Sequence, residues 1–388
     1  MESVAAVSAR TILDSHADWT IEVTVRTTTG VEGVAAVPTG ESQGKHEAVA
    51  VPADEAVRHV TERISPALAG MPLGDQAALD SRLIELDGTK DKSALGANAI
   101  LGTSLAYART TAAAHHVPLW QYLRGESGLQ PPFMMPRLFA LFTEGGLHAG
   151  GTLPFQEYLV IPRAGALRAS VELVQRFYAA YRQYLIKQFG AAATRLGDEG
   201  AFSPGFTDSS APFAALHEVA TALGIRDQVD FGLDAAASNV QMSVADLTAF
   251  YRQLRQEHGL AYFEDVFDEE DFVSFASLYA EFGDSVMIVG DDLTVTNVGR
   301  MQEAHEQKSI NAIIIKPNQI GTLTETLAAI KQARQYGWHV VVSHRGRETN
   351  DDFISDLAYG VGADGLKLGA PARGERVAKY NRLLAIGD

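Results

Sequence analysis

The 388-residue sequence contains no cysteine. Disulfide bonds, thiolate nucleophiles and zinc or iron–sulfur sites with cysteine ligands are therefore excluded. Metals that prefer oxygen ligands, such as Mg²⁺, remain compatible with this composition. An enzyme of the cytoplasm fits the absence of cysteine, and we expect that location.

Basic residues are also scarce, because 32 Lys and Arg stand against 48 Asp and Glu, for a formal net charge of −16. Nucleic-acid affinity depends on displacing counterions with basic side chains, and the sequence has no Lys/Arg cluster, so we expect no nucleic-acid partner. No apolar run approaches the ~20 residues that cross a bilayer, and residues 1–7 do not resemble a signal peptide. We therefore expect no membrane association, and an anionic substrate would need a local positive site.

The composition is nevertheless that of a protein with a large core, with 46% hydrophobic and 21% charged residues. The length suits a barrel of roughly 250 residues plus a smaller domain. A proline-rich segment at residues 131–136 breaks any helix and marks the expected boundary. We predict an α/β protein, with an α+β capping domain at residues 1–130 and a TIM-like β/α barrel at residues 131–388.

The first part of the chain has the pattern of a hairpin followed by helices. Apolar and polar residues alternate along residues 20–25, a turn follows at Thr29-Gly30, and residues 34–37 form a second apolar run. After a loop at residues 39–44, helical patterns cover residues 53–68, 76–86 and 97–115. These elements predict the α+β module.

The second part alternates short apolar runs with amphipathic helical stretches, as parallel β/α units do. Six successive runs finish on an ionisable residue, namely Asp234, Glu264, Asp291, Lys316, His344 and Lys367. Segments around Gln156-Glu157 and around residues 197–199 have the same pattern and bring the expected strand count to about eight. Because the carboxyl ends of barrel strands converge on one face, the pattern predicts a single site there.

A charged residue after a strand can also simply start a loop or cap a helix. Lys316 argues against that for the set, because it follows three isoleucines and burying an unpaired ammonium would cost several kcal/mol. Lys316 therefore needs carboxylates nearby, either in a structural salt bridge or in an active site.

The motif G-x-G-x-x-G at residues 360–365 follows a helical pattern and precedes a strand, so we interpret it as a helix-to-strand turn rather than a dinucleotide site.

Several blocks of sequence, in order, resemble the enolase family over nearly the whole chain. They are residues 9–15, 95–102, 197–200, 290–297, 316–321, 342–345, 369–371 and 379–381. The resemblance implies a magnesium-dependent carbon–oxygen lyase that reversibly dehydrates 2-phosphoglycerate to phosphoenolpyruvate, with two Mg²⁺ per active site. It also implies a homodimer.

The resemblance further implies roles for individual residues. Asp234, Glu264 and Asp291 would bind the first Mg²⁺, and Ser42 would contact a second Mg²⁺ and the substrate. Lys316 would be the base that takes a proton from the carbon beside the substrate carboxylate, with its pKa lowered by the bound cations. Glu199, supported by Glu157, would be the acid. The remaining implied site residues are His344 as a catalytic group and His148, Gln156, Lys367, Arg345 and Arg347 as substrate-binding groups, with Lys367 on the carboxylate and Arg345 on the phosphoryl group.

Several positions depart from the family pattern. The family's His-Arg-Ser-Gly-Glu is His344-Arg345-Gly346-Arg347-Glu348 in this chain. The change removes a hydroxyl expected near the phosphoryl group and adds the guanidinium of Arg347. Asn-Gly-Gly becomes Glu144-Gly145-Gly146, and Ser-Thr-Gly becomes Ser42-Gln43-Gly44. The alternative is thus a paralogue acting on a related phosphorus-containing acid, such as a carboxyphosphonoenolpyruvate synthase of phosphinate biosynthesis. Either substrate is a small phosphorylated or phosphonylated carboxylic acid, and retention of the acid, base and metal ligands disfavours a non-catalytic homologue.

Overall fold

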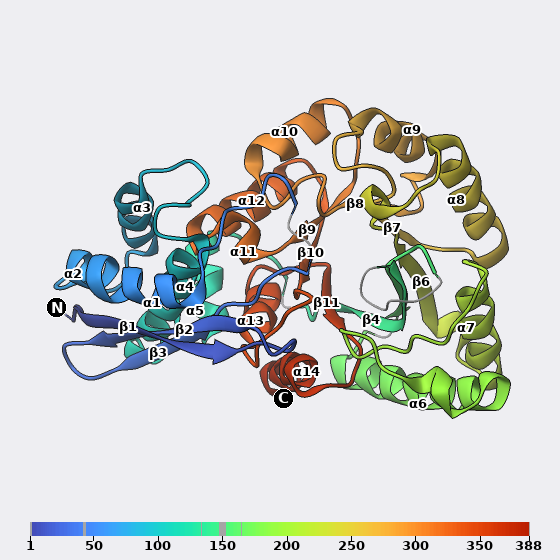
Figure 1. Ribbon diagram of the computed structural model, residues 1–388, viewed down its shortest axis with the longest axis horizontal. Helices are drawn as coiled ribbons and strands as arrows, with labels where there is room; N and C mark the ends of the chain where they lie inside the picture. Colours follow the sequence, from blue (N-terminus) through green and yellow to red (C-terminus); the bar gives the residue numbers. More distant parts are fainter. Residues whose placement is uncertain (1, 42–43, 133, 147–152, 164, 388) are drawn as a thin grey trace.

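The computed structural model describes residues 2–41, 44–132, 134–146, 153–163 and 165–387. Figure 1 shows a sheet and a group of helices from the first part of the chain beside a barrel surrounded by helices. The capping part contains β1 (Val4–Leu13), β2 (Trp19–Thr27), β3 (Glu32–Ala36), α1 (Ala53–His59), the π-helical η1 (Val60–Ile64), α2 (Ser65–Leu68), α3 (Gln76–Asp87), α4 (Ala97–Ala114) and α5 (Leu119–Ser127).

The three strands of the capping part form an antiparallel sheet in the order β1-β2-β3. Alternate residues of β2, Ile21, Val23 and Val25, are fully buried, as the period-two pattern predicts. Helix α4 covers this sheet, and Gly102 and Gly33 permit the close approach, because a Cβ at either position would clash with the opposite element. The predicted hairpin and the three predicted helices are thus confirmed, whereas β1 was not predicted.

The second part of the chain forms a closed barrel in the strand order β10-β11-β4-β5-β6-β7-β8-β9. Its strands are β4 (Arg137–Glu144), β5 (Glu157–Pro162), β6 (Val229–Asp234), β7 (Tyr262–Glu264), β8 (Met287–Gly290), β9 (Ala312–Ile315), β10 (His339–Ser343) and β11 (Gly365–Gly369). The fold class, a capping domain followed by a TIM-like barrel, is confirmed.

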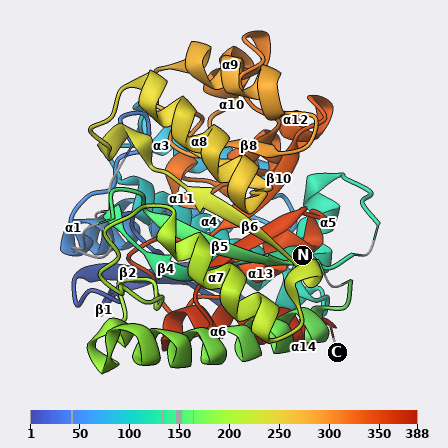
Figure 2. The same cartoon turned by 90° about the vertical axis from the view of Figure 1, so that its right-hand side faces the viewer.

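Helices pack around the barrel, as Figures 1 and 2 show from two sides. They are α6 (Leu167–Phe189), α7 (Ala211–Ala222), α8 (Val244–His258), α9 (Phe272–Phe282), α10 (Val298–Glu306), α11 (Pro317–Ile320), α12 (Leu323–Gln335), α13 (Phe353–Gly360) and α14 (Gly374–Gly387), with short 3₁₀ helices η3 (Ala191–Thr194), η4 (Arg226–Gln228) and η5 (Ala237–Asn239). The turn between α13 and β11 contains Gly362 at φ 62°, which confirms the predicted helix-to-strand turn.

Two details of the predicted barrel are wrong. Strand β5 runs antiparallel to both β4 and β6, so the barrel is not wholly parallel. Residues 197–199 are not a barrel strand either, because the eighth strand is β4 and this segment is a turn held near it. The reversed direction of β5 brings its first residue, Glu157, into register with Glu144 and Asp234, which are the last residues of β4 and β6. Glu157 therefore lies at the same barrel mouth as the carboxyl ends of the other strands.

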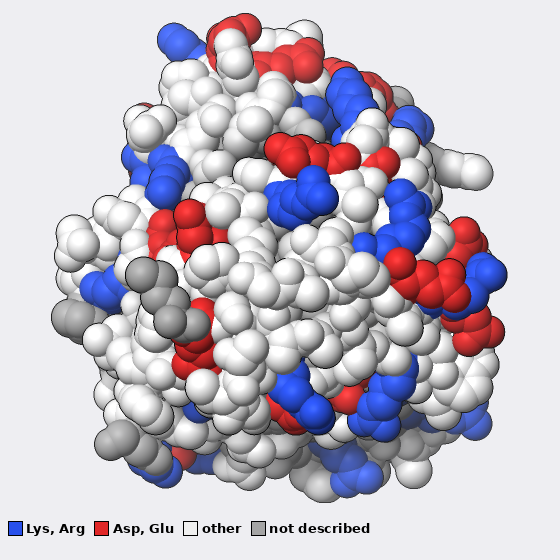
Figure 3. Space-filling view, turned by 90° about the vertical axis from the view of Figure 1, so that its left-hand side faces the viewer, with Lys and Arg blue, Asp and Glu red and all other residues white. Residues whose placement is uncertain are grey.

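The capping part presents a face on which charges of both signs are mixed. Figure 3 shows Lys and Arg side chains interspersed with Asp and Glu across this face, separated by uncharged surface. Among the described residues, no helix combines the length and the apolar character that crossing a membrane requires.

Candidate active site

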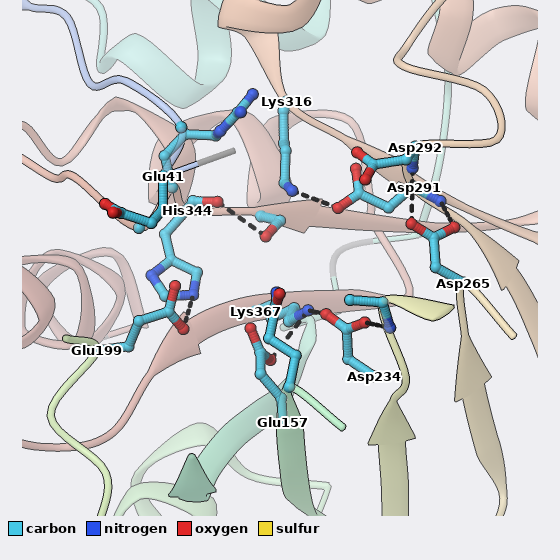
Figure 4. Close-up of a pocket in the computed structure, with 16 residues that line it drawn as sticks. Glu41, Glu157, Glu199, Asp234, Asp265, Asp291, Asp292, Lys316, His344 and Lys367 are labelled. Atoms are coloured by element: carbon cyan, nitrogen blue, oxygen red, sulfur yellow. Dashed lines mark hydrogen bonds and ion pairs between the residues drawn. The ribbon is translucent and has the colours of Figure 1, made fainter. Parts of the chain in front are cut away.

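A pocket at the barrel mouth is lined almost entirely by charged and polar side chains (Figure 4). Most of them come from the ends of barrel strands, and Gly40 and Glu41 come from the capping part. The lining residues are Gly40, Glu41, Gln156, Glu157, Glu199, Asp234, Ala236, Asp265, Asp291, Asp292, Lys316, Ser343, His344, Arg345, Gly346 and Lys367. The tertiary fold thus gathers most of the predicted site residues into one pocket.

Lys367 forms the centre of a buried cluster with three carboxylates. Its Nζ lies 2.8 Å from Asp234 Oδ2, 2.8 Å from Glu264 Oε1 and 3.0 Å from Glu157 Oε2. Burial acts to lower the pKa of Lys367, but the three carboxylates outweigh it and raise the pKa well above its ordinary value. The ammonium thus compensates carboxylates that burial would otherwise destabilise in their charged form.

Lys316 donates a hydrogen bond to Asp291 Oδ2 at the other side of the pocket. Gln319 Nε2 donates to Asp291 Oδ1 at 3.0 Å, so both oxygens of this carboxylate are engaged. Burial acts to lower the pKa of Lys316, yet the Asp291 carboxylate prevails and the pKa is raised. The lowering of this pKa by bound cations stays a prediction, because it requires a cation that competes with Lys316 for the Asp291 carboxylate.

Acidic side chains beyond the predicted set support the same region. Asp265 accepts hydrogen bonds from the backbone N–H groups of Asp291 at 2.9 Å and Asp292 at 2.8 Å. Burial and these two neighbours raise the Asp265 pKa well above its ordinary value. Carboxylate oxygens of Asp265, Asp291 and Asp292 all lie within 4.8 Å of one another, close enough to hold a metal ion. Asp265 was not among the predicted site residues, although it directly follows Glu264 at a strand end.

The predicted metal ligands offer a donor set that suits a hard cation. Asp234 and Glu264 share the Lys367 ammonium, and Asp291 lies in the same pocket. Burial and the neighbouring Asp234 raise the pKa of Glu264 to about 8. All three provide carboxylate oxygens and are nearly fully buried. Such oxygens are the ligands that Mg²⁺ prefers, so the residues fit a divalent cation that would take over charge compensation from the lysines.

His344 and Glu199 form a second buried pair. His344 Nε2 lies 3.3 Å from Glu199 Oε2, and His344 Nδ1 lies 2.7 Å from Arg376 Nη1. Because an arginine can only donate, Nδ1 accepts and the proton of a neutral imidazole resides on Nε2, directed at Glu199. Burial lowers the pKa of His344 to about 4, so the ring is neutral near pH 7. Arg376, fully buried on α14, was not predicted and fixes this tautomer.

The two arginines of the 344–348 segment point to different partners. Arg345 lines the pocket and binds Glu47 through Nη1–Oε2 at 3.0 Å and Nη2–Oε1 at 3.1 Å. Arg347 does not belong to the lining residues, and it binds Glu41 through Nε–Oε2 at 2.7 Å and also Asp18. The structure thus brings Arg345, but not Arg347, to the pocket wall.

The remaining predicted substrate-binding residues divide into two groups. Gln156 lines the pocket, whereas Ser42 and His148 lie outside the described residues.

Replacing these arginines separately should give unequal effects. We expect Arg345→Ala to raise the KM for an anionic substrate by roughly 10²-fold, since a buried cation that pairs with such a substrate contributes about 2–3 kcal/mol to its binding. Arg347→Ala should change KM by less than about threefold, because its ion pairs are partly exposed and therefore weak. Steady-state kinetics, with circular dichroism as a control for folding, would measure both. A larger KM increase in the Arg347 variant would contradict this placement.

Glu144, which replaces an asparagine of the family pattern, is buried at the end of β4. Its Oε1 accepts hydrogen bonds from the backbone N–H groups of Glu199 at 3.1 Å and Ala201 at 2.7 Å. Burial and the nearby Glu199 raise the pKa of Glu144 to about 8, against the effect of these hydrogen bonds and of Arg376. The sequence shows this departure from the family pattern, but it predicts no role for Glu144.

The raised Glu144 pKa predicts a pH-dependent stability change in Glu144→Gln. In the unfolded chain this carboxyl ionises near pH 4.5, whereas the folded protein holds its proton up to about pH 8. Between these values the folded state binds more protons, so its stability falls as pH rises, and a glutamine abolishes that loss. We expect Glu144→Gln to gain on the order of 1–3 kcal/mol relative to wild type between about pH 5 and pH 9 in urea unfolding. The exposed Glu62→Gln is the control, and an equal effect at both pH values would contradict the raised pKa.

An eight-stranded β/α barrel with lysines, carboxylates and a neutral histidine at its mouth defines the class of barrel enzymes that transfer protons. The family models "Enolase, N-terminal domain" and "Enolase, C-terminal TIM barrel domain" match residues 4–123 and residues 132–243 and 238–388. The chain belongs to the enolase family and is a carbon–oxygen lyase of the enolase type.

Known relatives are similar along nearly their whole length. Enolase of Methanopyrus kandleri is 40% identical over 418 residues, which cover 100% of this chain and 96% of the relative. Enolase B of Dictyostelium discoideum is 38% identical over 424 residues, covering 100% and 95%. Enolase of Thermococcus gammatolerans is 39% identical over 411 residues, covering 99% and 94%.

Proposed function

We propose that this enzyme reversibly dehydrates 2-phosphoglycerate to phosphoenolpyruvate in a magnesium-dependent reaction. The observation that carries the proposal is that Lys316 and Glu199 point into one acidic pocket from different sides (Figure 4). Elimination of water next to a carboxylate needs a base for the carbon-bound proton and an acid for the departing hydroxyl. The full-length similarity to enolases supports the same reaction.

In the forward direction, neutral Lys316 would remove the proton from the carbon beside the carboxylate. The electron pair of that C–H bond becomes the new C=C bond when the hydroxyl leaves, and Glu199 gives the hydroxyl a proton, so that water is released. Glu157 and the Nε2–H of His344 would hold Glu199 in place. Each proton therefore has a donor and an acceptor among the lining residues.

Charge on the substrate would be met by cations from several elements. Lys367 would bind the carboxylate and Arg345 the phosphoryl group, after exchanging part of their present ion pairs for the ligand. Asp234, Glu264 and Asp291 would hold Mg²⁺, which supplies electrostatic stabilisation as negative charge builds up on the substrate carboxylate. We also propose a second Mg²⁺ with Ser42 as a contact.

The alternative, a paralogue acting on a phosphonate analogue, has weaker support. One of the departures that suggested it is the additional guanidinium of Arg347, and that group binds Glu41 and Asp18. Another is the loss of a hydroxyl at Gly346, which lines the pocket and leaves room there without adding a group that would bind a phosphonate. We therefore favour 2-phosphoglycerate.

The direct test is turnover of 2-phosphoglycerate by the purified protein with Mg²⁺, followed by the absorbance of phosphoenolpyruvate. The corresponding phosphonate acid serves as a parallel substrate under the same conditions. We expect phosphoenolpyruvate at a rate typical of enzymes, about 1–10³ s⁻¹. Turnover of the phosphonate acid without turnover of 2-phosphoglycerate would establish the alternative.

We also propose that the enzyme is a homodimer, as the family resemblance implies. Leu13 and Trp19 are paired across β1 and β2 and are 55% and 67% exposed, so this end of the sheet offers apolar surface to a second copy. Sedimentation at several concentrations would test this proposal, and a monomer mass at every concentration would refute it.

A further inference from the structure

The turn at residues 197–201 carries Glu199 but belongs to no helix or strand. Within it, Gly197 N–H donates to Ala201 O at 2.9 Å and Gly200 N–H donates to Gly197 O at 3.3 Å. From outside, Glu144 Oε1 accepts the N–H groups of Glu199 and Ala201, at 3.1 Å and 2.7 Å. One carboxyl oxygen thus binds the backbone of Glu199 itself and that of the residue two positions later.

The space around this carboxyl group is shaped for it. Glu144 is 1% exposed, and a Cβ at Gly197 would clash with its Oε2 atom, so the turn packs directly on the carboxyl group. The backbone of Glu144 is fixed in strand β4, because Glu144 is paired with Glu157 of the neighbouring strand β5. Rigid support therefore runs from the barrel wall through Glu144 to Glu199.

We propose that Glu144 is a positioning residue, which fixes the 197–201 turn and thereby holds the Glu199 carboxyl group beside His344 and Glu157. The inference rests on the proposed function for the role of Glu199 and extends it to a residue that departs from the family pattern. Buried hydrogen bonds to backbone N–H groups are strong restraints, because breaking them leaves unsatisfied donors inside the protein.

Ionisable neighbours give the same contact an electrostatic consequence. Glu144 is surrounded by Glu199 from the turn, Glu157 from β5, Tyr178 from α6 and Arg376 from α14. Two buried carboxyl groups resist ionising together. The charge of Glu199 is therefore, after burial, the second effect that keeps Glu144 protonated.

The proposal predicts that Glu144 variants separate two reactions of the same substrate. Exchange of the carbon-bound hydrogen with deuterated solvent needs Lys316, whereas dehydration also needs Glu199 as acid. We expect Glu144→Ala to lower the dehydration rate by about 10²-fold and to change the exchange rate by less than about threefold. Glu144→Gln keeps a carbonyl oxygen for both N–H groups and should restore dehydration to within about threefold of wild type.

A matched control is Asp80→Ala. Asp80 is likewise a buried carboxyl group that accepts a backbone N–H, from Thr324 at 2.8 Å, but it is not among the lining residues. We expect it to lower stability without altering the ratio of exchange to dehydration. Parallel loss of both reactions in Glu144→Ala, or an equally impaired Glu144→Gln, would overturn the positioning role.

A second measurement needs no substrate. Amide hydrogen exchange followed by mass spectrometry should show at least tenfold faster exchange of the 197–201 segment in Glu144→Ala, with protection regained in Glu144→Gln and retained in Asp80→Ala. Unchanged protection in Glu144→Ala would overturn the inference. If the three variants show this pattern of amide exchange but the wild-type protein does not act on 2-phosphoglycerate, the proposed function alone is refuted.

Discussion

Lys316→Ala is expected to lower kcat by roughly 10⁴-fold, the upper range for loss of a positioned acid–base group. The same variant should lose solvent deuterium exchange at the carbon beside the carboxylate, because the other lysine that lines the pocket cannot take over as the base. Lys367, the second lining lysine, is surrounded by Asp234, Glu264 and Glu157, which hold its proton. Nuclear magnetic resonance of substrate incubated in deuterated buffer would measure the exchange.

Lys92→Ala provides the matched control for this experiment. Lys92 is also a buried lysine in an ion pair, with Glu325 at 3.0 Å, but it lies outside the pocket lining. Its removal should lower stability and leave hydrogen exchange intact. Exchange that persists unchanged in Lys316→Ala would show that another group is the base.

Removal of divalent cations with EDTA is expected to lower activity by about 10³-fold or more, which corresponds to several kcal/mol of transition-state stabilisation. Added Mg²⁺ should restore it. The melting temperature should also rise with Mg²⁺ concentration, because a ligand that binds only the folded state stabilises it. Full activity in the presence of EDTA would exclude the proposed cation site.

Two aspartates at opposite ends of β6 allow the site to be located. Asp234→Asn removes a carboxylate at the barrel mouth and should weaken Mg²⁺ binding by at least about tenfold, since hard cations prefer charged oxygen ligands. Asp230→Asn alters the same strand at its other end, where Asp230 binds Arg137 at 2.6 Å and Arg163 at 2.5 Å. Titration calorimetry should show unchanged Mg²⁺ affinity for Asp230→Asn. Equal weakening in both variants would indicate an indirect effect.

Sequence patterns were sufficient to predict six barrel strands and the residues near their ends. Apolar runs followed by Asp234, Glu264, Asp291, Lys316 and His344 correspond to β6 to β10, because a buried strand must be apolar until it reaches the barrel mouth. Lys367 was also predicted, although β11 continues past it to Gly369. These assignments depend only on local composition, which is why they could be made without coordinates.

The direction of β5 and the support of the site could not be predicted in the same way. An apolar run has the same pattern whether its strand is parallel or antiparallel, so the reversal of β5 depends on its pairing with β4 and β6. Arg376 and Glu144 likewise gave no local signal for their contacts. Their partners, His344 and the 197–201 turn, are brought to them only when the barrel closes.

By itself the sequence determined the fold class, the family and the chemical types of residue that the barrel mouth would carry, because hydrophobic periodicity and motif order are properties of the linear chain. Only the tertiary structure decided which charges compensate one another: Lys316 with Asp291, Lys367 with three carboxylates, and Arg347 with Glu41 rather than with the pocket. Electrostatic pairing depends on distances of a few ångströms between residues that are far apart in the chain, and those distances exist only after folding.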